Sequence, residues 1–136
     1  MAVNEGQLIK RKDDGVATGP IASGKILYEG TMVFVTTAGY LTDVIASGAN
    51  RFFGIACRTY DNSGGGNGAL AAECYTDGVH ELVGSGFGQT QVGEDIYASD
   101  NYTITTSNSS TSFIGPCEYY VSATVLGIRL LPMHTP

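Results

Sequence analysis

The sequence contains no tryptophan, few charged residues and no long hydrophobic run. Charged residues make up 15% of the 136 residues, which argues against a charged helical bundle. Hydrophobic residues make up 43%, so the composition also argues against a chain that is disordered throughout. Because no apolar run approaches the roughly 20 residues of a membrane-spanning helix, we predict no membrane partner.

Cysteine is scarce, and its spacing matches neither the common metal sites nor a disulfide framework. Cys57, Cys74 and Cys117 are odd in number and none belongs to a CxxC pair, so we predict no metal site and no obligatory disulfide. Cys57 and Cys74 lie in apolar runs, where a free cysteine behaves as a small buried hydrophobic residue. The N-terminus lacks the apolar stretch of a secretory signal, so we expect synthesis in a reducing cytoplasm.

Histidine is also scarce, and neither histidine belongs to a nucleophile motif. His80 lies in an alternating segment, where we expect it to face solvent or a neighbouring subunit, and His134 lies near the chain end. Glu81 would form a carboxylate pair for glycoside chemistry with Glu94-Asp95 only if the fold brought them together, and exposed turn acids are commoner. We predict no catalytic residues, no cofactor and no enzymatic activity.

Two stretches match ligand-binding loops in part. Residues 19–25, GPIASGK, match the start of a phosphate-binding loop, but Ile26 replaces the Ser or Thr that holds magnesium and no hydrophobic strand precedes Gly19. Residues 61–68, DNSGGGNG, offer one carboxylate, which is too little charge for a calcium site. We therefore interpret residues 61–68 as a plain hairpin loop and expect no nucleotide at residues 19–25.

Glycine is abundant, and it separates short runs that are typical of strands. Nineteen glycines punctuate segments rich in β-branched and aromatic residues. Asp77-Gly78 is a pair that type I′ turns favour, so it predicts a hairpin, and Gly54 within a strand indicates a bulge or a point of close packing. We predict an all-β, small single-domain β-barrel or β-sandwich of about eight to ten short strands. The predicted strands are 26–28, 31–36, 40–44, 52–60, 69–76, 79–83, 92–99, 102–106, 113–120 and 124–130.

The beginning of the chain differs from the rest in its pattern. Residues 1–24 are polar and only weakly periodic. We predict that they form an extended N-terminal arm, which orders only against another surface. The β domain is then predicted to cover residues 25–136.

Charge is also unevenly distributed along the chain. Residues 1–25 carry a net charge of +1, whereas residues 26–128 carry a net charge of −8. An acidic body repels phosphate backbones, so we predict no nucleic-acid partner. The basic cluster Lys10, Arg11 and Lys12 is a candidate contact for an acidic surface, with a solvated turn as the commoner alternative.

Two stretches of the β domain resemble a known family. Residues 52–82 contain FGIA, YDNSGGGNG and DGVHEL, and residues 92–106 continue with VGEDIYASDNYTITT. Over residues 25–130, the chain resembles the small capsid decoration (cement) proteins of tailed bacteriophages. The resemblance implies a structural virion protein on the outer surface of the expanded capsid, synthesised in the host cytoplasm. It also implies a homo-oligomer, with a homotrimer favoured, that stabilises the capsid by bridging neighbouring copies of the major capsid protein.

The resemblance leads to expectations about which residues form interfaces. We expect the arm, with Lys10, Arg11 and Lys12, to contact the capsid or an adjacent subunit. We expect Tyr119 and Tyr120 to supply apolar surface for self-association, together with Phe52 and Phe53, for which an ordinary place in the core is the alternative. The alternative function is a carbohydrate- or partner-binding β module of a phage tail or cell surface. Eight tyrosines suit sugar stacking, but the absence of tryptophan leaves no recognisable aromatic platform.

Overall fold

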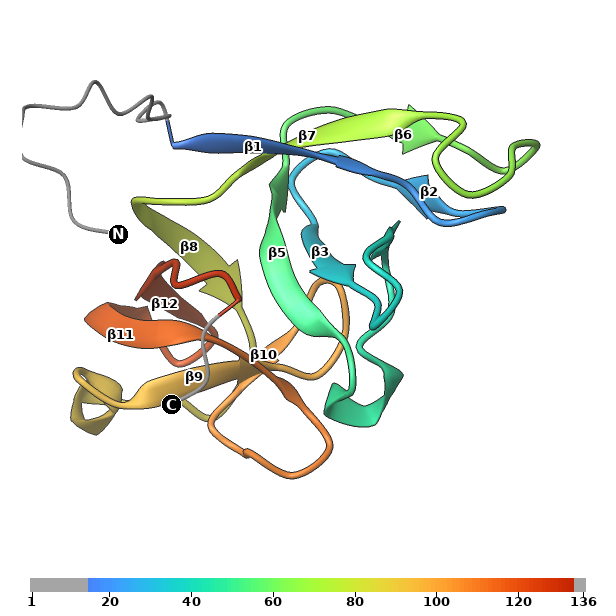
Figure 1. Cartoon of the computed structure of the whole chain (residues 1–136). Coiled ribbons are helices and arrows are strands. Elements are labelled where there is room, and N and C mark those ends of the chain that lie inside the picture. Colours follow the sequence, from blue (N-terminus) through green and yellow to red (C-terminus); the bar gives the residue numbers. More distant parts are fainter. Residues whose placement is uncertain (1–14, 134–136) are drawn as a thin grey trace, which may run out of the picture.

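Runs of β-branched and aromatic residues, separated by glycine, form twelve strands in the computed structural model, which describes residues 15–133 (Figure 1). Two open five-stranded sheets and one two-stranded sheet contain all of these strands. The prediction of an all-β single domain is confirmed. The described strands outnumber the predicted eight to ten, and the sheets pack in layers without closing into a barrel.

The first sheet has the order β1-β7-β5-β3-β4, and all of its pairings are antiparallel. Met32, Val33 and Phe34 of its strand β3 are almost completely buried. Successive side chains of a strand point to opposite faces, so this run shows that both faces of the sheet are covered. The strands are β1 (Val16–Pro20), β7 (Ala71–Tyr75), β5 (Arg51–Ala56), β3 (Met32–Val35) and β4 (Leu41–Thr42).

The second sheet has the order β10-β9-β11-β12-β8 and occupies the lower left of Figure 1. Its longest strand, β11, pairs with β9 through its first half and with β12 through its second half. The strands are β10 (Ile104–Thr105), β9 (Asp95–Ala98), β11 (Ser112–Ser122), β12 (Val125–Arg129) and β8 (Val79–Val83), and two 3-10 turns, η1 (Ala46–Gly48) and η2 (Gln89–Gln91), lie in the connections.

The larger hydrophobic core lies between the two five-stranded sheets. Phe34 of β3 and Phe52 of β5 meet edge to face with ring centroids 6.2 Å apart, an arrangement that favours the aromatic pair. The second sheet faces them with aliphatic side chains. The buried members are Met32, Phe34, Phe52, Ile55, Leu82, Phe87, Ile96, Ala98, Ile104, Ile114, Cys117, Leu126, Ile128 and Leu130.

A smaller core lies on the opposite face of the first sheet. The two-stranded sheet of β2 (Ile26–Leu27) and β6 (Tyr60–Asp61) covers it, with Leu27 buried and Tyr60 packed at its margin. The first sheet is therefore the middle layer of the domain. The buried members of this core are Ile21, Leu27, Val33, Leu41, Ala56, Ala72 and Cys74.

The loop at residues 61–68 is organised by a buried side chain. Asn62 is 3% exposed, and its amide nitrogen donates to the carbonyl oxygens of Ile21, Ala22 and Gly66. The bonds to Ile21 and Ala22 attach the loop to the connection between β1 and β2, which contains residues 21–25 of the segment that matches a phosphate-binding loop. Strand β2 follows that connection where a phosphate-binding loop needs a helix.

The described part of the predicted arm belongs to the first sheet. Residues 16–20 form β1, which pairs with β7 from Val16 opposite Tyr75 to Pro20 opposite Ala71. Ile21 is fully buried in the smaller core. The predicted boundary at residue 24 is therefore corrected, because backbone pairing and burial of Ile21 compensate for the polar composition. Residues 1–14, with Lys10, Arg11 and Lys12, lie outside the described residues.

The predicted hairpin at Asp77-Gly78 is wrong. Gly78 does have a left-handed φ of +83°, as such a turn requires. However, β7 pairs with β1 and β5, whereas β8 pairs with β12, so the turn carries the chain from one sheet to the other. The apolar faces of the two strands are buried in different cores, and this burial outweighs the local turn preference.

Gly54 lies where β5 and β7 approach closely. A Cβ atom at this position would lie 2.4 Å from the carbonyl oxygen of Tyr75 and 2.9 Å from the Cβ of Cys74. The neighbouring register shift places Phe53 as an extra residue in β5 between the pairs Val33–Gly54 and Phe34–Phe52. The prediction of a bulge or close packing at Gly54 is confirmed.

We expect Gly54→Ala to lower the free energy of unfolding by about 1–3 kcal/mol, because backbone must move to admit the methyl group. Gly64→Ala is the matched control, since a Cβ there meets nothing within 4 Å. We expect the control to change stability by less than about 0.5 kcal/mol. Urea unfolding measures both, and equal effects would contradict the close approach of β5 and β7.

The buried thiol of Cys74 leads us to predict a loss of stability at high pH. Its side chain is 0% exposed, and burial raises the pKa of its thiol from 9.0 to about 12. Between these values the unfolded chain releases a proton that the folded chain keeps, so stability should fall as pH rises, by at most about 1.4 kcal/mol per pH unit. Cys74→Ala should show a shallower decline in urea unfolding from pH 9 to 11. The tyrosines titrate in both proteins, so an identical decline would refute the assignment.

Candidate functional site

One face of the second sheet carries the exposed interface candidate. This outer face is the solvent-facing side of β11, β12 and β8, marked by Tyr119, Glu81 and Arg129. Tyr119 is 40% exposed and pairs with Gly127 of β12. Its ring lies over that glycine, because a Cβ there would be 2.4 Å from the ring. The Tyr119 hydroxyl donates to Glu81 Oε2 at 2.9 Å, and this bond raises the pKa of the tyrosine.

Paired charges border the ring on the same face. The guanidinium of Arg129 donates to both carboxylate oxygens of Glu118, with one bond of 3.0 Å from Nη2 to Oε1. This bidentate contact lowers the pKa of the Glu118 carboxyl. Each of the two pairs, Tyr119 with Glu81 and Arg129 with Glu118, therefore restrains its own side chains. A fixed aromatic ring with a polar border is the composition that protein interfaces favour.

The second tyrosine candidate lies on the other side of β11. Tyr120 pairs with Leu126 and packs against the larger core, so only part of its ring is accessible. Phe52 is 1% exposed in the same core, and Phe53 packs against the smaller one. For the phenylalanines the alternative of an ordinary core position is confirmed. The structure does not bring Tyr119, Tyr120 and Phe52 together into one surface cluster.

The N-terminal segment enters the body beside the edge of the second sheet. The Thr76 amide donates to the Gly15 carbonyl at 2.8 Å, and Gly15 lies against the carboxylate of Asp77. Strand β8 begins two residues later and is the last strand of its sheet. One edge of β8 pairs with β12. Among the described residues, the other edge pairs only through an isolated bridge from Val83 to Thr103. Residues 1–14 therefore continue from a point next to an incompletely paired strand.

Two shallow hollows, of about 280 Å³ and 140 Å³, lie along this edge and share Gly30, Glu81 and Leu82. Tyr75 lines the first and is 45% exposed, and Tyr102 lines the second and is 60% exposed. The edge of β8 thus combines unpaired backbone, exposed aromatic rings and a carboxylate. Such an edge is open to an added strand from another chain.

The titratable groups at the first hollow are not arranged as a nucleophile and its base. His80 is half-buried, its ring lies 6.0 Å from that of Tyr75, and its Nε2 lies 3.3 Å from the Asp77 carbonyl oxygen. Burial raises the pKa of the half-buried Cys57 thiol, which is the opposite of the activation that a nucleophile needs. Cys57 therefore departs from the expectation of a fully buried residue, whereas Cys74 fulfils it.

The acidic residues considered from the sequence lie apart. Glu81 is on β8, whereas Glu94 precedes β9 and Asp95 begins it, and β12 and β11 separate these two strands. Within residues 15–133, no three His, Cys, Asp or Glu side chains are grouped so that they could hold a metal ion. No helix in that part of the chain is long and apolar enough to cross a membrane.

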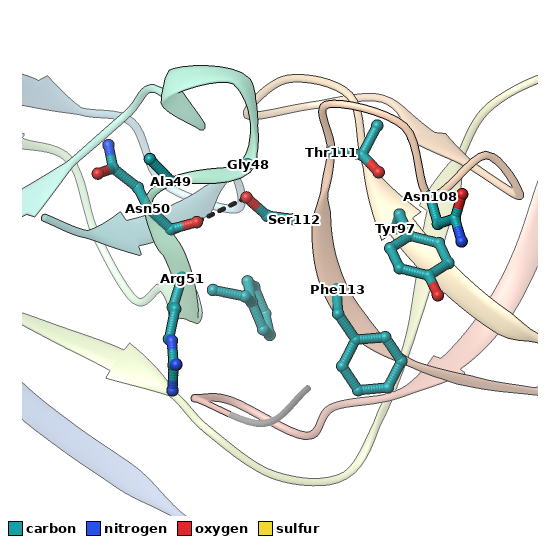
Figure 2. A pocket seen from close by; sticks show the side chains of 10 residues that line it. Gly48, Ala49, Asn50, Arg51, Tyr97, Asn108, Thr111, Ser112 and Phe113 are labelled. Carbon is teal, nitrogen blue, oxygen red and sulfur yellow. Dashed lines mark hydrogen bonds between the residues drawn. The ribbon is translucent and has the colours of Figure 1, made fainter. Parts of the chain in front are cut away.

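A pocket of about 440 Å³ lies at the start of β11, where Ser112 and Phe113 line it (Figure 2), whereas Tyr119 is in the second half of that strand. One wall is the segment from η1 into β5, with Ala49, Asn50 and Arg51, and the other is formed by β9 and the start of β11. The Ser112 hydroxyl donates to the Asn50 carbonyl at 2.7 Å and ties the walls together at the base. We call this site the aromatic pocket. It is lined by Gly48, Ala49, Asn50, Arg51, Phe52, Tyr97, Asn108, Thr111, Ser112 and Phe113.

Aromatic rings and polar groups meet in the aromatic pocket. Tyr97 and Phe113 pack edge to face with centroids 5.7 Å apart. Arg51 supplies the only charged side chain of the lining. Sequence reasoning missed this site, because its residues come from β5, β9, β11 and the loop before β11. No motif in the sequence marks those segments as neighbours.

Comparisons of the chain with protein-family models, with curated proteins and with solved structures find no match. The resemblance to phage decoration proteins therefore stays a prediction from residues 25–130.

Proposed function

We propose that this protein is a capsid decoration protein that binds the outer surface of an expanded phage head and bridges major capsid proteins. The observation that carries the proposal is the place where residues 1–14 join the body, beside the edge of β8 and its exposed tyrosines. A segment that leaves a stable body at such an edge can order against a neighbouring chain and add contact area.

The distribution of charge supports different roles for the arm, which attracts an acidic partner, and for the acidic body. Lys10, Arg11 and Lys12 belong to the arm, whereas residues 26–128 carry a net charge of −8. The acidic body repels other copies at long range, and the basic cluster attracts an acidic partner surface. The proposed partner of the arm is therefore an acidic patch on the capsid or on an adjacent subunit.

Co-sedimentation with undecorated heads of the cognate phage tests the function. We expect saturable binding to expanded heads, at a whole-number ratio per capsid hexamer, and no binding to unexpanded proheads. Absence of binding to expanded heads would overturn the proposed function.

Removal of the arm tests how the protein binds. Residues 2–14 should be deleted and no more, since β1 begins at Val16. We expect the deletion to abolish binding to expanded heads while the melting temperature stays nearly unchanged, because the deleted residues precede the first sheet. The triple variant with Gln at positions 10, 11 and 12 should weaken binding, and more so at low salt, where charge pairs are strongest. Full binding of the deletion variant to expanded heads would show that the arm is not required for capsid binding.

Self-association through the outer face is tested with Tyr119→Ser. Tyr119 is the appropriate residue, because Tyr120 also packs against the core. We expect the variant to shift a trimer toward monomer by about tenfold or more in dissociation constant, as loss of a central interface aromatic does. Tyr28→Ser is the control, since Tyr28 is 52% exposed and lines neither this face nor the hollows along the edge of β8. Native mass spectrometry measures both, and an unchanged oligomer would exclude Tyr119 from the interface.

A further inference from the structure

We propose that the aromatic pocket binds a single sugar ring that carries a carboxylate, such as a uronic acid unit of a polysaccharide. This inference does not depend on the capsid function, because it concerns a different surface of the same body. Its volume of about 440 Å³ is within the usual range for small-molecule sites.

The aromatic rings of the pocket suit the apolar face of a sugar ring. A pyranose presents a face of C–H groups that packs on aromatic carbon, and its rim presents hydroxyl groups. Phe113 and Tyr97 lie together on one wall (Figure 2), and Phe52, which is 1% exposed, also lines the pocket. The edge-to-face contact between Tyr97 and Phe113 fixes the orientation of both rings.

The polar groups of the pocket are one cation and several neutral side chains that both donate and accept hydrogen bonds. Arg51 carries the only charge, and no Asp, Glu or Lys lines the site, although residues 26–128 are strongly acidic. The described part of the chain provides no hydrogen-bond partner for the Asn108 amide or the Tyr97 hydroxyl. The Asn108 amide and the Tyr97 hydroxyl can each donate or accept, which suits the hydroxyl groups of a sugar. The Arg51 guanidinium donates once to the Met133 carbonyl at 3.4 Å, and its other N–H groups favour a carboxylate on the ligand.

Several polar groups of the lining make hydrogen bonds within the protein that hold the pocket in shape. The Asn50 amide donates to the Val44 carbonyl, and the Thr111 hydroxyl donates to the Ser107 carbonyl. With the bond from Ser112 to Asn50, these contacts hold both walls before any ligand arrives. A pre-formed site loses less conformational entropy when it binds.

Strained backbone is concentrated around the same pocket. Within residues 15–133, the non-glycine residues with left-handed φ are Ala46 (+50°), Ser47 (+52°), Ser110 (+57°) and Met133 (+66°). The first two lead into Gly48, the third precedes Thr111, and the Met133 carbonyl accepts a 3.4 Å bond from Arg51. Such residues are destabilising and collect at ligand sites, where the surrounding structure fixes them.

Gly48 explains why the two walls can meet. It has a φ of +91°, and a Cβ atom there would lie 2.7 Å from the Thr111 carbonyl oxygen. The left-handed run at residues 46–48 therefore turns the chain so that glycine, and no side chain, faces the start of β11. This strained segment forms part of the rim of the pocket, and no side chain at position 48 fills the interior.

The test is two-dimensional NMR of the ¹⁵N-labelled full chain titrated with three probes: glucuronate, glucose and acetate. Glucuronate has the ring and the carboxylate, glucose has the ring alone, and acetate has the carboxylate alone. We expect glucuronate to shift the amide signals of Arg51, Asn108 and Phe113 with a dissociation constant near 1 mM, which is about −4 kcal/mol. Glucose and acetate should bind at least about tenfold more weakly.

Two variants assign the effect to the pocket. Arg51→Ala should weaken glucuronate binding by about tenfold, whereas Arg58→Ala removes the same charge from an exposed position outside the pocket and should leave it unchanged. Asn108→Ala, in an exposed loop, provides a second variant that does not disturb the core. An unperturbed spectrum without ligand verifies the fold of each variant.

Three outcomes would overturn the proposal. The proposal fails if no amide signal of a pocket residue shifts at tens of millimolar glucuronate, a concentration well above the expected dissociation constant. Acetate binding as strongly as glucuronate would indicate a simple carboxylate site, such as one for a peptide chain end. Equal losses in Arg51→Ala and Arg58→Ala would show that only net charge matters and that the pocket does not bind the sugar.

Discussion

Burial of both faces of β3 and β5 is the constraint on which the rest of the structure depends. Phe34 and Phe52 face the larger core, whereas Val33 and Ala56 face the smaller one. A sheet with two apolar faces needs a cover on each side, and the second sheet and the β2–β6 pair supply these covers. Gly54 lets β7 approach closely enough to complete the middle layer. Functional groups are therefore displaced to the outer face, the sheet edges and the loops.

Strand β11 connects the two surfaces to which we assign roles. Its first residues, Ser112 and Phe113, line the aromatic pocket, and Tyr119 lies on the outer face. Six residues of extended strand span roughly 20 Å, so the two surfaces lie far enough apart to be occupied at the same time. A protein that contacts the shell through its arm and other copies through its outer face would use neither contact to cover the pocket. The proposed sugar site and the proposed capsid role are therefore compatible.

Local sequence patterns predicted the elements better than their partners. Short β-branched runs separated by glycine correspond to the described strands, and Gly54 was recognised as a point of close packing. The pair Asp77-Gly78 does form a turn with a left-handed glycine, but it joins two sheets. Turn preference depends on a few neighbouring residues, whereas strand partners depend on which core each apolar face enters. The weakly periodic β1 was missed because its pairing with β7 stabilises it through backbone bonds, and backbone bonds leave no hydrophobic pattern.

The sequence by itself determined the all-β class, most of the strand positions and the acidic body with its basic N-terminal cluster, because composition and alternation are local properties. Only the tertiary structure decided that Tyr119 is exposed while Tyr120 packs against the core, since the bulges in β11 change the alternation. It also decided the aromatic pocket. Arg51, Tyr97 and Phe113 belong to different strands, and they meet only because the two sheets pack against a common core.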